Sequence, residues 1–306
     1  MSYFIHLFLN IMLPIFMLIL AGITLKRQFE IDVKTLIKIQ FNLVIPVMLF
    51  IKLYESKLSG DIAFIVILTI ILVMSGVYIL TYVISKLRGY TKNETNALVN
   101  SSTFFNSGNF SLPLMELLFE NPLALSIQAI ILLVHNILFF TIGIFNASSG
   151  RKRPLDAIKN ILKMPLIYFI SVAIALKSLN IEIWSPLWES MNILSGAFVP
   201  IALITLGAQL QDTKFKFNNA RLYFSNFMRL IISPLLTYLV TLILGIEGLI
   251  AQVLIISAAA PTAVNVALTA IEFDNEPDFS SQAVLTSTIL CSITMTFTIY
   301  LALKFV

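Results

Sequence analysis

The chain alternates between long apolar stretches and short polar breaks along its whole length. Apolar windows of about twenty residues, each long enough to cross a bilayer as a helix, recur ten times. They lie near residues 4–25, 35–54, 62–84, 95–119, 123–146, 164–180, 188–210, 219–243, 248–271 and 280–303. The breaks carry charged or turn-forming residues and are too short for a soluble domain. The pattern predicts an all-α polytopic membrane protein with ten transmembrane helices.

The fourth apolar window is interrupted by polar residues at its middle. The stretch from Phe104 to Pro113 reads FFNSGNFSLP, with two Asn, two Ser and a Gly before the Pro. A free backbone N–H or C=O group costs several kcal/mol in hydrocarbon, so a helix broken at mid-depth must be buried in protein or line a watery cavity. The residues from Asn96 to Phe105 rise about 15 Å as a helix, which places the break near the middle of a bilayer core about 30 Å thick. A plain kink is the alternative, because Gly and Pro are common in membrane helices.

The ninth window is interrupted in the same way, five spans later. Its middle, SAAAPTAVN from Ser257 to Asn265, is small, polar and interrupted by a proline. Spans two and seven also match, with Pro46 and Pro200 at the same place. Because each half would hold five spans, an odd number, the two halves would form inverted repeats. Matching breaks in inverted halves indicate a transporter site at the bilayer midplane, and they favour a functional break over a kink.

The basic residues predict which loops face the cytoplasm. Of the twenty Lys and Arg residues, fifteen fall in odd-numbered loops, and short cytoplasmic loops retain positive charge. We therefore expect a multi-pass protein of the cell membrane, plasma or inner, with both termini outside. The loop from Glu272 to Asp278 is acidic although it is predicted to be cytoplasmic. The net charge of +4 reflects this topology and gives no reason to expect nucleic acid.

Composition and motifs exclude several other classes of protein. With 58% hydrophobic residues, 12% charged residues and a mean hydropathy of +0.93, the chain lies far from soluble domains. The single cysteine, Cys291, rules out an internal disulfide or a thiolate metal site. The two His residues form no zinc motif, and the sequence contains no Walker loop or Gly-x-Ser-x-Gly elbow. We expect no enzyme activity, no metal and no cofactor.

The two breaks predict the residues that hold a cargo. The second half-helices should begin near Ser107 to Asn109 and near Pro261 or Thr262. A helix start carries roughly half a positive charge and unpaired N–H groups, so with no Asp or Glu expected nearby it favours an anionic group. The opposing carbonyl ends, near Phe105 and Ala260, leave a place for a sodium ion. The predicted substrate-binding residues are Asn106, Ser107, Gly108, Asn109, Pro261, Thr262 and Asn265.

Other polar residues inside the spans have two interpretations each. His135, followed by Asn136, is a candidate for proton or ion coupling, and a neutral imidazole hydrogen-bonded between helices is the alternative. For Arg229 a structural role is favoured. Its stem is also long enough to bring the guanidinium back to cytoplasmic phosphates. Glu116 is expected at the outer mouth, and Gln128 and Gln209 are polar candidates without a motif.

Five pieces of sequence, in order and at their spacing, resemble one transporter family over essentially the full chain. They are Asn42 to Phe50, Asn106 to Leu114, Val199 to Leu210, Arg229 to Leu236, and Pro261 to Asn265. The chain is similar to bacterial members of the auxin efflux carrier family, which includes the plant PIN proteins. The chain differs from the plant proteins at the first crossing, where Phe105 or Asn106 stands in place of their proline.

The resemblance implies two inverted repeats, residues 1–147 and 164–306, joined by a cytoplasmic linker at 148–163. It also implies a scaffold made of spans one, two, six and seven, and a transport domain made of spans three to five and eight to ten. Helices four and nine would be broken and crossed, and the cargo would be a small organic anion. A homodimer through the scaffold is compatible with this arrangement.

The sequence therefore predicts a secondary transporter of a small organic anion, a carboxylate, that works by alternating access. Either Na⁺ or H⁺ remains open as a coupling ion. The alternative is a sodium/proton exchanger or a sodium-coupled bile-acid-like carrier with the same crossed-helix design. Such exchangers usually carry acidic residues beside the crossing, and none is found in this sequence.

Overall fold

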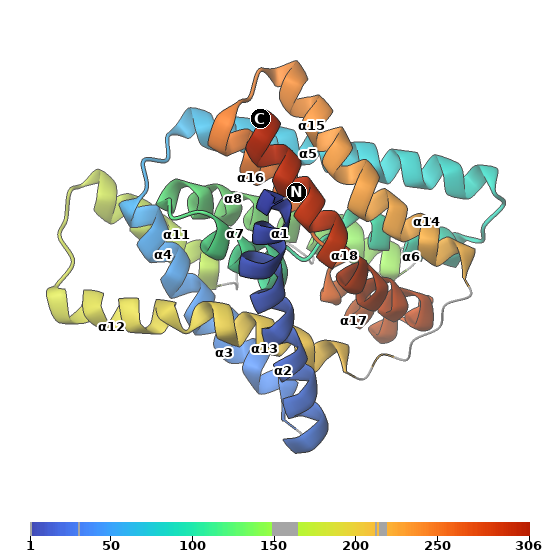
Figure 1. Cartoon of the computed structure of the whole chain (residues 1–306), viewed down its shortest axis with the longest axis horizontal. Helices are drawn as coiled ribbons and strands as arrows, with labels where there is room; N and C mark the ends of the chain where they lie inside the picture. The colour runs from blue at the N-terminus through green and yellow to red at the C-terminus, as the bar shows by residue number, and fades with distance from the viewer. Residues whose placement is uncertain (1, 30, 149–164, 212, 214–218) are drawn as a thin grey trace.

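The computed structural model describes residues 2–29, 31–148, 165–211, 213 and 219–306. In these ranges the regular elements are helical (Figure 1). One isolated β-bridge, between Phe105 and Thr262, joins two connectors. Among the described residues, seven helical stretches are long and apolar enough to cross a bilayer, and Pro165–Ser178 and Gly248–Ala258 are shorter apolar helices. The prediction of an all-α polytopic membrane protein is thus confirmed for these ranges. The predicted linker 148–163 lies, apart from Ser148, outside the described residues.

The helices coincide with the ten predicted windows, and most of them extend a few residues beyond the window. The first part of the chain holds α1 (Ser2–Leu7), η1 (Phe8–Met12), α2 (Leu13–Phe29), α3 (Val33–Ile39), η2 (Gln40–Val44), α4 (Ile45–Glu55), α5 (Gly60–Leu87), α6 (Lys92–Thr103), η3 (Ser107–Ser111), α7 (Leu112–Leu118), α8 (Pro122–Leu138), η4 (Phe139–Gly143) and α9 (Ile144–Ala147). The second part holds α11 (Pro165–Ser178), α12 (Ser185–Gly196), α13 (Phe198–Leu210), α14 (Ala220–Phe227), η5 (Met228–Ile232), α15 (Ser233–Leu244), α16 (Gly248–Ala258), α17 (Val264–Glu272) and α18 (Pro277–Phe305).

The elements labelled η are π-helical turns, and prolines explain most of them. The turns η1, η2, η3 and η5 each end two residues before a proline, namely Pro14, Pro46, Pro113 and Pro234. A proline ring clashes with the carbonyl four residues earlier, and in each case that residue lies inside the π turn. The wider turn moves this carbonyl away from the ring. The spans can therefore continue as helices past their prolines.

Two glycines allow the first and seventh spans to cross at backbone contact. A Cβ on Gly207 of α13 would lie 1.9 Å from the carbonyl oxygen of Ile19, and one on Gly22 of α2 would lie 2.1 Å from that of Ile204. Because glycine has no side chain, the two backbones touch where any other residue would clash. Helix α4 packs against α11 and α12, so spans two, six and seven are also in contact.

The remaining helices form a second group of contacts. Helix α5 packs against α6 and α15, and in Figure 1 α5 and α15 lie along the edge of the molecule opposite α12. Helix α18 packs against α16, α17 and α14. The two chain ends lie close together, since the rings of Tyr3 and Tyr300 are 6.1 Å apart (Figure 1).

An arginine joins three loops at one end of the molecule. Arg221 pairs with Glu94 through Nη1 at 2.9 Å and with Glu276 through Nη2 at 3.2 Å. These residues lie at the starts of spans four, eight and ten, next to loops that the sequence places on the same side. The acidic loop around Glu276 is therefore paired with a positive charge from the start of span eight instead of one from its own sequence.

Candidate functional site

The breaks in spans four and nine meet inside the protein. Helix α6 ends at Thr103 and η3 begins at Ser107, while α16 ends at Ala258 and α17 begins at Val264. The two connectors run antiparallel. The amide of Asn106 donates to the carbonyl of Pro261 at 2.8 Å, and the amide of Ala263 donates to that of Phe104 at 3.0 Å. Both segments are therefore breaks with their own backbone pairing and not kinks.

This pairing shifts the ends of the half-helices from their expected places. The sequence places the start of the second half-helix of span nine at Pro261 or Thr262, which is wrong, because α17 begins at Val264. The carbonyl of Pro261 and the amide of Ala263 bond to the other connector, and this keeps the chain extended between them. The first half-helices likewise end at Thr103 and Ala258, two residues before the expected Phe105 and Ala260.

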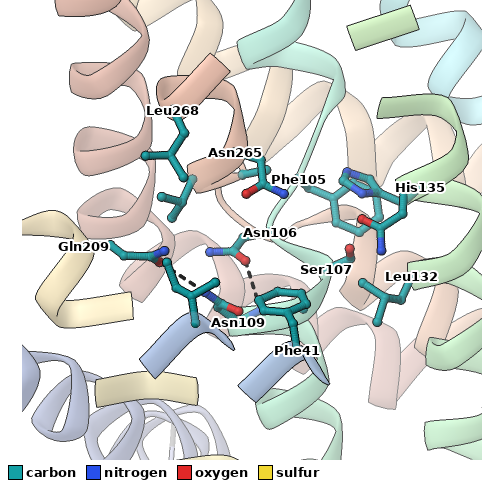
Figure 2. Close-up of a pocket in the computed structure, with 15 residues that line it drawn as sticks. Phe41, Phe105, Asn106, Ser107, Asn109, Leu132, His135, Gln209, Asn265 and Leu268 are labelled. Carbon is teal, nitrogen blue, oxygen red and sulfur yellow. Dashed lines mark hydrogen bonds between the residues drawn. The ribbon is translucent and has the colours of Figure 1, made fainter. Parts of the chain in front are cut away.

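Asn109 connects the broken fourth span to spans two and seven. The Gln40 side chain in η2 donates to Asn109 Oδ1 at 2.9 Å, and Asn109 Nδ2 donates to Gln209 Oε1 of α13 at 3.1 Å. Asn106 Oδ1 accepts the backbone amide of Asn109 at 3.1 Å and so caps the start of η3. Figure 2 shows Asn106, Asn109 and Gln209 on one side of the crossing.

A small cavity of about 70 Å³, here called the crossing cavity, lies beside the connectors (Figure 2). Seven of the predicted residues line it: Asn106, Ser107, Gly108, Asn109, His135, Asn136 and Asn265. Pro261 and Thr262 are not among the described residues that line it. Thr262 is fully buried, and its hydroxyl donates to the carbonyl of Ser101 at 2.8 Å. Its hydroxyl is therefore engaged within the protein, and substrate binding by Pro261 and Thr262 stays a prediction.

Several donors at the crossing cavity have no acceptor in the described part of the chain. The Nδ2 atom of Asn106 is buried without a partner, and that residue is 6% exposed. The backbone amides of Gly108, Val264 and Asn265 also lack an acceptor there. An unsatisfied buried polar group costs roughly 1–3 kcal/mol, so the buried Asn106 amide favours an acceptor from outside the chain, and the free amides at the two helix starts point to the same kind of partner.

His135 lies on the opposite wall between aromatic rings (Figure 2). Its ring centroid is 4.8 Å from that of Phe105 and 5.7 Å from that of Phe104, both in edge-to-face geometry. Neither ring nitrogen has a hydrogen-bond partner among the described residues. The expected interhelical hydrogen bond is therefore not found there, and proton coupling through His135 remains a prediction.

Arg229 packs inside the protein, in agreement with the structural role favoured for it, and its guanidinium does not turn back towards cytoplasmic phosphates. Its side chain is 1% exposed and points inward, and its guanidinium donates to backbone carbonyls of Ser102, Thr103 and Ala258. It does not reach a lipid phosphate, because the carbonyl ends of the broken helices offer acceptors within the protein. Glu116, by contrast, is half-buried and pairs with Lys52 at 3.0 Å, in keeping with an outer position.

A larger cavity of about 600 Å³, here called the entry cavity, adjoins the crossing cavity. The two share Ile37, Gln209, Val264 and Leu268 as lining residues. The entry cavity extends to Lys34, Thr213 and Asp278, which lie next to odd-numbered loops. The entry cavity therefore lies between the crossing cavity and these loop ends.

Sequence reasoning missed Gln40 and underrated Gln128. Gln128 donates to the carbonyl of Ser107 at 3.2 Å and accepts from the hydroxyl of Ser257, so it joins η3 to α16. Gln40 is fully buried and holds Asn109. The available signal was the same for Gln40 and Gln209, namely an uncharged amide within an apolar window.

A helical membrane protein in which two interrupted helices cross beside a polar cavity has the architecture of a membrane transporter. The chain belongs to the family described as membrane transport protein, the auxin efflux carrier type, whose model matches residues 7–299. It is also similar to an "Uncharacterized transporter" of Methanothermobacter thermautotrophicus, with 28% identity over 291 residues, which cover 92% of this chain and 94% of the relative. The sequence-based family assignment is therefore confirmed.

Proposed function

We propose that this transporter is a secondary carrier of a small organic anion, a carboxylate, held at the crossing cavity. The observation that carries the proposal is the convergence of unpaired donors in a cavity whose lining residues include no Asp or Glu. A carboxylate accepts several hydrogen bonds at once and suits such a set of donors.

The helix ends favour the same sign of charge. Residues from Ser107 to Leu118 form one continuous stretch of η3 and α7, and α17 runs from Val264 to Glu272. Both starts line the crossing cavity, and each carries roughly half a positive charge. Together they offset about one negative charge in a water-poor site.

The two cavities suggest where the two parts of a cargo, its carboxylate group and its body, would bind. The crossing cavity has room for a carboxylate group or a few waters, while the entry cavity has the size of a small-molecule site. Much of the entry cavity is apolar, with Ala208, Leu210, Ala267, Leu268 and Ile271 among its lining. An anion with a compact apolar body is the favoured substrate class.

The two groups of helix contacts support a carrier that works by alternating access. Spans one, two, six and seven would form the scaffold, and spans three to five and eight to ten the moving part, in two inverted five-helix repeats. Asn109 lies at their boundary, since its partners Gln40 and Gln209 belong to scaffold spans. The bilayer surrounds this assembly, and a homodimer would form through the scaffold. The described state opens towards the basic loops, which would make it inward-facing in the cell membrane.

The exchanger alternative needs an acidic residue at the crossing to bind its cation. The lining residues of the crossing cavity provide amides, a histidine and apolar side chains instead. Among the described lining residues of the entry cavity the one acid is Asp278, next to the loop before span ten. The anion carrier is therefore the better match.

A binding screen tests the proposal directly. The melting temperature of the purified protein is measured with mono- and dicarboxylates and with their neutral amides, because a ligand of the native state raises stability by mass action. We expect a carboxylate to raise the melting temperature and its amide not to do so. Asn265→Ala should abolish the rise, while Asn10→Ala, at an exposed position near the N-terminus, should retain it. Stabilisation by cations alone would support the exchanger.

A further inference from the structure

Arg229 is bound to both broken helices at once. Its Nη1 atom donates to the carbonyl oxygens of Ser102 at 3.1 Å and Thr103 at 2.9 Å, at the end of α6. Its Nη2 atom donates to the carbonyl of Ala258, the last residue of α16, and to the hydroxyl of Ser233. No carboxylate pairs with this guanidinium in the described part of the chain. The acceptors are therefore mainly backbone carbonyls.

These carbonyls are the negative ends of two helix dipoles. Each helix C-terminus carries roughly half a negative charge, so the two together carry about one. The single positive charge of Arg229 balances them. In transporters with interrupted helices, unwound carbonyls and half-helix C-termini are also the groups that coordinate Na⁺. Arg229 thus lies where a coupling cation would be expected.

The neighbouring carbonyls are also engaged. The carbonyl of Ser101 accepts from the Thr262 hydroxyl, and that of Phe104 accepts from the amide of Ala263. The carbonyl of Pro261 accepts from the amide of Asn106. A sodium ion placed among these oxygens would compete with these donors and meet the guanidinium at contact distance, where like charges repel.

Arginine suits this position because of its shape. The planar guanidinium presents five N–H donors in a fixed fork, so one side chain reaches both helix ends. It also lies over the ring of Phe105, with its central carbon 5.1 Å from the ring centroid. Phe105 lines the crossing cavity, so the fixed charge lies one aromatic ring away from the candidate anion site.

We propose that Arg229 is a built-in cation that takes the place of a coupling sodium ion, so that the carrier works without sodium. The claim that transport needs no sodium rests on the proposed function. The claim that Arg229 occupies the cation position does not, because it concerns only the helix-end carbonyls and the guanidinium that binds them.

The test of the ion site uses sodium itself as the probe. The melting temperature of the full-length protein is measured in NaCl, KCl and choline chloride at one ionic strength. We expect no sodium-specific shift for the wild type. Arg229→Ala should melt at a lower temperature and gain a saturable rise with Na⁺ over choline, because the vacated carbonyl ends again attract a cation. Arg27→Ala, at an exposed position, should behave as the wild type.

Two results would overturn the proposal. One is a saturable, sodium-specific rise in the wild type, and the other is a folded Arg229→Ala protein that responds to Na⁺ no more than the wild type does. If Arg229→Ala does not fold, the same titration is done with Arg229→Gln. If neither variant folds, the wild-type titration decides, because a sodium-specific rise there overturns the proposal.

A separate measurement tests transport. Uptake into proteoliposomes of the carboxylate found in the binding screen should be unchanged when choline replaces sodium, and uptake that requires sodium would overturn the proposal. If no carboxylate binds, the proposed cargo fails while the sodium titration still decides the ion site.

Discussion

The side-chain amide of Asn109 donates to Gln209 Oε1 across 3.1 Å, and this hydrogen bond joins the broken fourth span to the seventh. Gln40 binds the same asparagine from span two at 2.9 Å. If the transport domain moves against the scaffold, both bonds must break. They therefore stabilise the described state relative to its alternative.

We predict that Gln209→Ala shifts this equilibrium away from the described state. A net hydrogen bond contributes about 0.5–1.5 kcal/mol, so the shift should be about two- to tenfold. The measurement is thiol labelling from the basic-loop face of a cysteine at Leu268, an exposed residue of the entry cavity, in a Cys291→Ser background. Gln28→Ala, at an exposed position of α2, is the control. Equal labelling of both variants would contradict the prediction.

Substitutions of Asn106 and Asn265 by alanine should differ in their effects on stability. Asn265 is exposed in the crossing cavity, so Asn265→Ala should abolish uptake and change the free energy of unfolding by no more than about 0.5 kcal/mol. Asn106→Ala should abolish uptake and also destabilise by about 0.5–2 kcal/mol, because Asn106 caps η3. Uptake and melting temperature check both. Retained uptake by Asn265→Ala would remove that residue from the site.

The sign of the cargo is tested at Asn265 rather than at Thr262. Thr262 is buried and bonded to Ser101, so an acid there would disturb the fold. Asn265→Asp keeps the shape and adds a negative charge that repels a carboxylate, and we expect affinity to fall more than about tenfold, by Coulomb repulsion. The loss should shrink at low pH as the new acid is protonated. Calorimetry with Asn265→Ala as the neutral comparison checks this, and affinities that stay equal across pH would favour a cation.

Gly207→Ala should destabilise the protein strongly. The added methyl would lie 1.9 Å from the carbonyl oxygen of Ile19, so α2 and α13 must separate. Overpacking of this kind costs about 1–3 kcal/mol or more. The melting temperature is compared with that of Gly196→Ala, where an added methyl meets no atom within 4 Å. Equal melting of the two variants would show that the helix contact is looser than described.

The topology is tested by labelling single cysteines at three exposed positions in or next to loops. Cysteines at Lys86 and Glu272 should react from the same side of the membrane, and one at Lys57 from the other side. The reason is that Arg221 joins the loops of the first two sites through Glu94 and Glu276. Cys291→Ser is again the background. Labelling of Lys86 and Glu272 from opposite faces would refute the inverted arrangement. Gly150, in the predicted cytoplasmic linker, is a further labelling position that lies outside the described residues.

Sequence alone could predict the helices and the place of the breaks. The apolar windows and the polar stretches at Asn106 and Pro261 are local signals, because the bilayer sets span length and tolerates irregular backbone only in protected places. The pairing of Phe105 with Thr262 is a contact between distant segments, and it shifts the start of α17 to Val264. No local pattern contains that information.

The direction of long side chains could not be predicted either. The same stem lets Arg229 reach either a lipid phosphate or the interior, and the choice depends on which carbonyls are left free by helices elsewhere in the chain. Gln40 is a similar case, because its role as a hydrogen-bond donor depends on Asn109 lying opposite it. Both roles arise only from the assembled crossing.

The π turns before prolines have a consequence for how these spans tolerate changes in length. Each π turn contains one residue more than an α-helix would need, so it rotates everything beyond it by about 100°. Deleting one residue within Gln40–Val44 or Met228–Ile232, together with replacing the following proline, would restore a plain α-helix. The same deletion a few turns away would rotate half of a span and present its buried face to lipid. Spans one, two, four and eight therefore each contain one short segment where a single-residue gap is structurally tolerable, and alignments with relatives should place their gaps there.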